Sequence, residues 1–137
     1  MYQPRQAVKS TMMMSVEPQC TPDKFSATLL HSITVTHMLH LGTRSYAHHM
    51  ALGTLYENLG DLVDEVIEVW QGINQKLISF EGEMFSVPKD ENQYVKWLAE
   101  FISNNRSVMG SDSQLQNLID EIAAEVDRCN YKLNFLG

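Results

Sequence analysis

The apolar residues of the chain follow helical spacing in four separate stretches. In each stretch they recur every three or four residues, the spacing that places side chains on one face of an α-helix. The chain contains only four prolines and seven glycines, and long stretches are free of both, which favours helices over many short strands. The pattern therefore predicts an all-α protein with four helices.

Capping residues indicate where these helices begin, and glycines indicate where two of them end. Thr21 can cap the first helix, with Pro22 at the first helical position, and Gly42 fits its C-terminus. Ser45 can cap the second helix, which is expected to end at Gly72. The predicted helices cover residues 21–41, 46–71, 90–109 and 112–135.

Each predicted helix has an apolar face that should point inward. On the first two helices these faces are Phe25, Leu29, Leu30, Ile33, His37 and either His40 or Leu41, and then His49, Leu52, Tyr56, Leu59, Val63, Val66 and Trp70. On the last two helices they are Tyr94, Val95, Trp97, Leu98, Phe101 and Ile102, and then Leu115, Leu118, Ile119, Ile122, Val126, Cys129 and Leu133.

The connections between the helices predict the topology. The short link after Gly42 makes the first two helices antiparallel neighbours. Residues 72–89 have no single period and are long enough to carry the chain back along the second helix, so the third helix should run parallel to the second. We therefore expect an N-terminal tail over residues 1–20, and over residues 21–137 a four-helix bundle with one long crossover between its second and third helices.

Composition and charge exclude several classes of protein. The net charge of −7 is unlike that of a protein that binds nucleic acid over its whole surface. No apolar run is long enough to cross a bilayer, and the N-terminus lacks the apolar core of a secretory signal. Cys20 and Cys129 are far apart and lack metal-site spacing, which favours free thiols and a location inside a cell or in a particle assembled there.

The histidines are the first candidates for chemistry. His37 and His40 share one face of the first helix, and His48 and His49 lie in the first turn of the second helix. Because these two helices are antiparallel, three or four imidazoles should gather near one end of the bundle. Imidazole is a good ligand for iron, zinc and copper. The alternative is a set of half-buried, hydrogen-bonded histidines without a ligand.

The acidic residues of the second helix are the second candidates. Glu57, Asp61, Asp64 and Glu68 form one narrow stripe, roughly opposite the predicted core face. Such a stripe is typical of a solvated helix face. Aligned carboxylates without a base between them also repel one another, and a cation, a basic partner or a neighbouring subunit would relieve that repulsion.

Several catalytic signatures are missing from the sequence. No acidic residue has a histidine three positions later, which is the pattern of internal di-iron bundles. The chain also has no phosphate-binding glycine loop, no nucleophile elbow and no Cys–His zinc pattern. Enzymes of those classes are disfavoured.

Two short runs, Thr36-His37-Met38-Leu39-His40-Leu41 and Asp64-Glu65-Val66-Ile67-Glu68, resemble parts of Dps, the ferritin-like DNA-binding protein of starved cells. The C-terminal run 131–137 and the pair His49 and Tyr56 are also similar. The chain is most similar to uncharacterised ferritin-like proteins of tailed phages, through residues 43–53, Tyr56-Glu57, 70–72 and 118–122.

The resemblance implies a ferritin-like fold, self-assembly and an iron site shared between subunits. In Dps, histidines from one subunit and a pair of acids from the other form the ferroxidase site. The positions that match this acid pair are Thr54 and Asn58, so the pair is missing, but Glu57 and Asp61 lie beside them with the same spacing. The expected metal-binding residues are His37, His40, His49, Glu57 and Asp61, with iron or zinc as the ion.

Two functions follow from this interpretation. The first is a Dps-like homo-oligomer that binds a metal ion, with ferroxidase activity implied by resemblance alone. The second is a non-enzymatic phage protein that uses the bundle as a scaffold and contacts virion or host proteins. Both place the protein in the host cytoplasm or in the virion. The tail contains only Arg5 and Lys9 as basic residues, which argues against DNA compaction.

Overall fold

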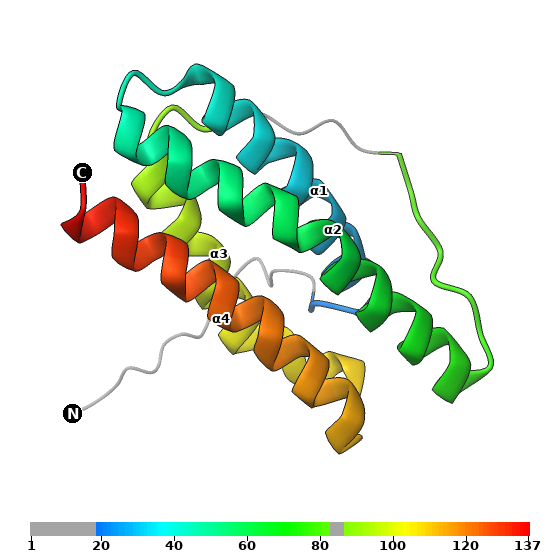
Figure 1. Ribbon diagram of the computed structural model, residues 1–137. Helices are drawn as coiled ribbons and strands as arrows, with labels where there is room; N and C mark the ends of the chain where they lie inside the picture. Colours follow the sequence, from blue (N-terminus) through cyan, green and yellow to red (C-terminus); the bar gives the residue numbers. More distant parts are fainter. Residues whose placement is uncertain (1–18, 83–86) are drawn as a thin grey trace, which may run out of the picture.

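The computed structural model describes residues 19–82 and 87–137, and it is helical throughout its regular parts. The four predicted helices are confirmed, and the described residues contain no strand. A short 3₁₀ helix, η3 (Arg106–Met109), follows the third α-helix. The α-helices are α1 (Pro22–Gly42), α2 (Tyr46–Asn74), α3 (Glu91–Asn105) and α4 (Ser113–Phe135) (Figure 1).

Three of the helices begin at side chains that satisfy free backbone donors. The Thr21 hydroxyl accepts from the amide of Lys24 at 3.1 Å, and the Ser45 hydroxyl accepts from His48 at 3.2 Å. The Asp90 carboxylate accepts from the amides at the start of α3. These bonds replace the intrahelical partners that the first turn of a helix lacks, and they explain why three helix starts were predictable.

Two predicted helix ends were wrong. Gly72 lies inside α2, which continues to Asn74 and ends where Gln75 adopts a left-handed conformation with φ of 49°. The third helix is α-helical only to Asn105, because its last turn tightens into η3. Gly110, with φ of 105°, then turns the chain into α4, which a residue with a β-carbon would do only at a cost.

Contacts at one end of the bundle fix the helix directions. Thr43, just after α1, donates to Glu91 at the start of α3. His48 at the start of α2 contacts the carbonyl of Leu133 near the end of α4. We call this the hairpin end, and the opposite end the far end. α2 and α3 therefore run in one direction and α1 and α4 in the other, so α2 ends at the far end and α3 begins at the hairpin end (Figure 1).

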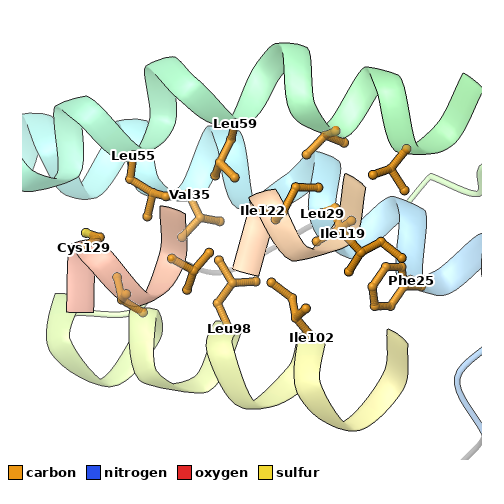
Figure 2. Close-up of a cluster of buried hydrophobic side chains, with 14 of the residues drawn as sticks. Phe25, Leu29, Val35, Leu55, Leu59, Leu98, Ile102, Ile119, Ile122 and Cys129 are labelled. Atoms are coloured by element: carbon orange, nitrogen blue, oxygen red, sulfur yellow. The ribbon is translucent and has the colours of Figure 1, made fainter. Parts of the chain in front are cut away.

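All four helices contribute to one apolar core (Figure 2). α2 packs against α1 and α4, and α3 packs mainly against α4. Phe25 stacks on Phe101 with ring centroids 5.7 Å apart, which joins the start of α1 to α3. The fully buried side chains include Phe25, Leu29, Leu52, Leu55, Leu59, Val63, Leu98, Ile102, Ile119 and Ile122.

The predicted inner face of α1 was partly wrong. Leu30 and Ile33 are only partly buried, and His37 and Leu41 are exposed. The buried positions are instead Phe25, Ser26, Leu29, Ser32, Val35, Thr36 and Leu39. The Ser32 and Thr36 hydroxyls donate to carbonyls of their own helix at 2.6 and 2.7 Å. Because these hydroxyls are satisfied locally, they can lie in the core without the usual desolvation cost.

Three further expectations concern the rest of the chain. Cys20 and Cys129 are both free, and burial raises the pKa of the Cys129 thiol to about 12. Within the described part of the chain, no helix combines the length and the apolar character that a membrane span requires. The predicted tail lies outside the described residues except for Gln19 and Cys20.

Candidate functional site

His40 and His49 bind each other's backbone across the α1–α2 hairpin. The Nδ1 atom of His40 lies 2.7 Å from the carbonyl oxygen of His49, and the Nδ1 atom of His49 lies 2.8 Å from the carbonyl oxygen of His40. A carbonyl oxygen only accepts, so each Nδ1 must carry the proton. The two rings stack with centroids 3.8 Å apart. We call this pair the histidine clasp.

The clasp leaves the second nitrogen of each ring available. In a neutral imidazole with its proton on Nδ1, the Nε2 atom has a free lone pair. A backbone carbonyl that accepts from the other ring nitrogen is a common arrangement around histidines that bind metal ions, because it fixes the tautomer and orients the ring. Each ring of the clasp therefore keeps one Nε2 donor, whose orientation is fixed by the hydrogen bond at Nδ1.

The sequence builds the clasp from helix ends and one glycine. His40 lies in the last turn of α1, where carbonyls lack intrahelical partners, so its carbonyl can accept from His49. Gly53 lies beneath the His40 ring. A β-carbon at Gly53 would lie 2.9 Å from Cε1 of His40, so any larger residue would displace the ring.

His37 and Tyr56 extend the clasp into an aromatic cluster. The ring of His37 lies 4.1 Å from that of Tyr56 and 6.2 Å from that of His40, measured between centroids. His40 meets Tyr56 edge to face at 5.2 Å. The structure thus brings together the three predicted histidines. The sequence analysis placed Tyr56 on the inner face and paired it with His49 in the resemblance to Dps, but it did not predict that the Tyr56 ring would contact His37 and His40.

His48 lies beside His49 in the sequence but belongs to a different network. Its Nδ1 atom lies 2.8 Å from Oε2 of Glu91, and its Nε2 atom lies 3.2 Å from the carbonyl of Leu133. Both partners only accept, so both bonds form when the ring is doubly protonated. Thr43 donates to the same carboxylate oxygen at 2.7 Å. We call this network the Glu91 clamp.

The carboxylate of the clamp is held in its charged form. Burial raises the pKa of the Glu91 carboxyl, but the hydrogen bonds from Thr43 and His48 lower it by more. The net pKa therefore lies below that of an ordinary glutamate. The clamp connects α1, α2, α3 and α4 at the hairpin end, and it uses one of the four histidines that were expected to gather there.

The predicted acidic ligands face a different neighbour. Glu57 and Asp61 line a groove between α2 and α4, whereas the clasp joins α2 to α1. In this groove Asn58 donates to Glu125 at 3.0 Å, and Arg128 forms an ion pair with Glu125. Burial raises the pKa of Glu125, but these bonds lower it by more.

One chain does not assemble the full predicted ligand set. Within residues 19–82 and 87–137, no three His, Cys, Asp or Glu side chains converge as a metal site. The clasp supplies two imidazole donors, which suits iron, zinc or copper, and further donors have to come from elsewhere. A five-residue site formed by His37, His40, His49, Glu57 and Asp61 stays a prediction.

Comparison with known proteins gives one result. No curated protein and no solved structure matches the chain. The model of a family of unknown function, DUF5856, matches residues 40–133. This segment begins at the first histidine of the clasp and ends at the last residue of α4 that the clamp contacts. Because the match covers well over half of the sequence, the chain belongs to the DUF5856 family.

Proposed function

We propose that the protein is the subunit of a Dps-like, ferritin-like homo-oligomer, and that the histidine clasp binds a transition-metal ion such as iron or zinc. The observation that carries the proposal is the pair of backbone-anchored imidazoles, His40 and His49, each with its Nε2 lone pair free. A histidine with a purely structural role needs only one hydrogen bond. Two stacked rings that are fixed in the same tautomer form, in addition, a preorganised pair of metal ligands.

The surface around the clasp supports self-association. From Phe25 to Thr43 the chain has no Asp, Glu, Lys or Arg, and α1 has apolar residues on its outer side as well as in the core. Leu41 is 69% exposed and Tyr46 is 77% exposed. A helix that is apolar on all sides is normally covered, and a second copy of the same uncharged face would cover it without charge repulsion.

A second copy would also supply what the clasp lacks. Glu57 and Asp61 are exposed at the edge of the α2–α4 groove, so a subunit that packs across the outer side of α2 as well as α1 would bring carboxylates close to the clasp of its partner. The helix directions agree with a ferritin-like bundle that has one long crossover. Ferroxidase activity would require this shared arrangement.

A second candidate is a scaffold in a phage particle or at a host target, without a metal. Thr54 and Asn58 stand where the resemblance to Dps expects acids, and Asn58 already donates to Glu125. Under this alternative the clasp only joins α1 to α2, and its loss would lower stability without changing metal content.

The decisive experiment is an iron and zinc titration of protein purified without a histidine tag. His40→Ala should abolish uptake, and so should Gly53→Ala, which keeps every histidine but displaces the His40 ring. His31→Ala is the matched control and should bind as the wild type does. Affinity should fall at acid pH, because protons compete for Nε2. Equal, negligible uptake by all four proteins would favour the scaffold.

Light scattering tests the assembly separately. Leu41→Glu places a charge on the proposed interface, and we expect a cost of about 3 kcal/mol, or roughly a hundredfold weaker association. Leu77→Glu is the control, because Leu77 is 76% exposed and follows the C-terminus of α2, at the end of the bundle opposite Leu41. A monomeric wild type at micromolar concentration would contradict the proposed oligomer.

A further inference from the structure

Charge is distributed unevenly along the bundle. The contacts of His37 with Tyr56 and of Asn58 with Glu125 mark one level across the helices. Beyond this level, the far half comprises residues 19–36, 57–82 and 99–125, and it contains twelve acidic and three basic side chains. The described residues of the hairpin half contain three acidic and five basic ones. The two ends therefore carry charge of opposite sign.

The outer side of α4 is apolar at the hairpin end. Tyr131 and Phe135 contact each other with ring centroids 6.0 Å apart. Tyr131 is 55% exposed, Phe135 is 76% exposed, and the adjacent Leu136 is 56% exposed. Lys132 lies between them in the sequence. We call these four residues the α4 strip. Large exposed apolar side chains that gather in one place mark interaction sites.

The outer row of α2 at the far end carries the charge opposite to that of Lys132. Asp61, Asp64, Glu65 and Glu68 are all exposed, and none of them takes part in an ion pair among the described residues. No basic residue lies between Glu57 and Glu68. A partner that approaches this row gains if it is basic and loses if it is acidic.

We propose that the α4 strip of one copy binds the acidic outer row of α2 on a second copy. Charge complementarity selects this occupant, because two hairpin ends would repel each other and so would two far ends. The contact is heterologous, because one copy contributes its α4 strip and the other its acidic row. The pair therefore keeps one acidic row and one α4 strip free. Repetition of such a contact produces a ring or a filament.

This second contact does not depend on the proposed α1–α2 interface. The two proposals share Asp61 but otherwise use different residues, so each can fail alone. The end contact should be examined in the Leu41→Glu background, where only the α4 strip and the acidic row remain to hold copies together. Association there should weaken about tenfold as salt rises from about 0.1 M to 1 M, since exposed charges are screened.

A mixing experiment tests the heterologous geometry, again in the Leu41→Glu background. The first variant removes the strip with Phe135→Ser and Lys132→Glu, and the second neutralises the row with Asp64→Asn, Glu65→Gln and Glu68→Gln. Native mass spectrometry should show each variant alone as a monomer. An equimolar mixture should form a one-to-one pair, because the first variant keeps the row and the second keeps the strip.

Three outcomes would overturn the proposal. Self-association of the row variant alone would show that the strip pairs with another strip. A monomeric Leu41→Glu parent over the whole concentration range would show that no end contact forms. Cosedimentation of that parent with anionic phospholipid vesicles, abolished by Phe135→Ser, would assign the strip to a membrane surface. Thermal melts of both variants check that the bundle remains folded.

Discussion

The histidine clasp and the Glu91 clamp use neighbouring residues for opposite chemistry. His49 meets a backbone carbonyl, so its ring is satisfied while neutral and keeps a lone pair. His48 meets a carboxylate as well as a carbonyl, so its ring is satisfied only when it carries charge. Consecutive residues of an α-helix point in directions about 100° apart. His48 and His49 therefore meet different acceptors. One face of α2 is suited to holding a ligand, and the other is suited to fixing α3.

The largest effect should follow from breaking the clamp at its carboxylate. Glu91→Ala leaves the half-buried His48 ring without its partner at Nδ1, and Thr43 without its acceptor. We expect a loss of about 2 kcal/mol in the free energy of unfolding, measured by urea denaturation. Glu91→Gln keeps an acceptor oxygen and should lose about half as much. A Glu91→Ala protein as stable as the wild type would mean that the clamp does not fix α3.

The clasp should respond to a single methyl group. Gly53→Ala improves helix propensity, but its β-carbon lies within contact of His40, so we expect a net loss of about 1 kcal/mol. Gly72→Ala is the matched change in the same helix. Nothing lies near its β-carbon, so it should gain about 0.5–1 kcal/mol. Thermal melts of both variants measure the difference. A Gly53→Ala protein that is more stable than the wild type would show that the His40 ring moves aside at little cost.

The smallest effect concerns pH. Because folding lowers the pKa of Glu91, its interactions stabilise the protein fully above the ordinary glutamate pKa of 4.5. That contribution is lost as pH falls below this value through the lowered pKa of the folded state. The stability difference between the wild type and Glu91→Gln should therefore shrink from pH 6 to pH 3. A constant difference over this range would show that Glu91 gains nothing from its charge.

Much of the fold was predictable because its signals are local. Thr21 and Ser45 satisfy the first turns of their helices as predicted, and Asp90, where the third helix was expected to begin, does the same. The end of α2 was not predictable, because Gln75 takes a left-handed conformation that its sequence does not favour. The core face of α1 was missed for another reason. The buried hydroxyls of Ser32 and Thr36 interrupt the apolar periodicity of α1. A pattern of polar and apolar residues does not reveal that these hydroxyls form hydrogen bonds within their own helix.

The candidate site was predictable only in part. An antiparallel hairpin suffices to bring His37, His40 and His49 together. The choice of partner for each ring is a tertiary property, because Glu91 lies 43 residues from His48 and its approach depends on the crossover. For the same reason the sequence placed His48 with the other histidines, whereas the structure places it in the clamp.

The clasp also has a consequence for the order in which contacts can form. Its two hydrogen bonds join residues nine positions apart, whereas the contact of His48 with Leu133 joins residues 85 positions apart. Closing the longer loop costs about 2 kcal/mol more chain entropy. The α1–α2 hairpin can therefore close on its own early in folding and offer α4 a formed surface. The ring of contacts at the clamp closes only when the whole chain has been brought together.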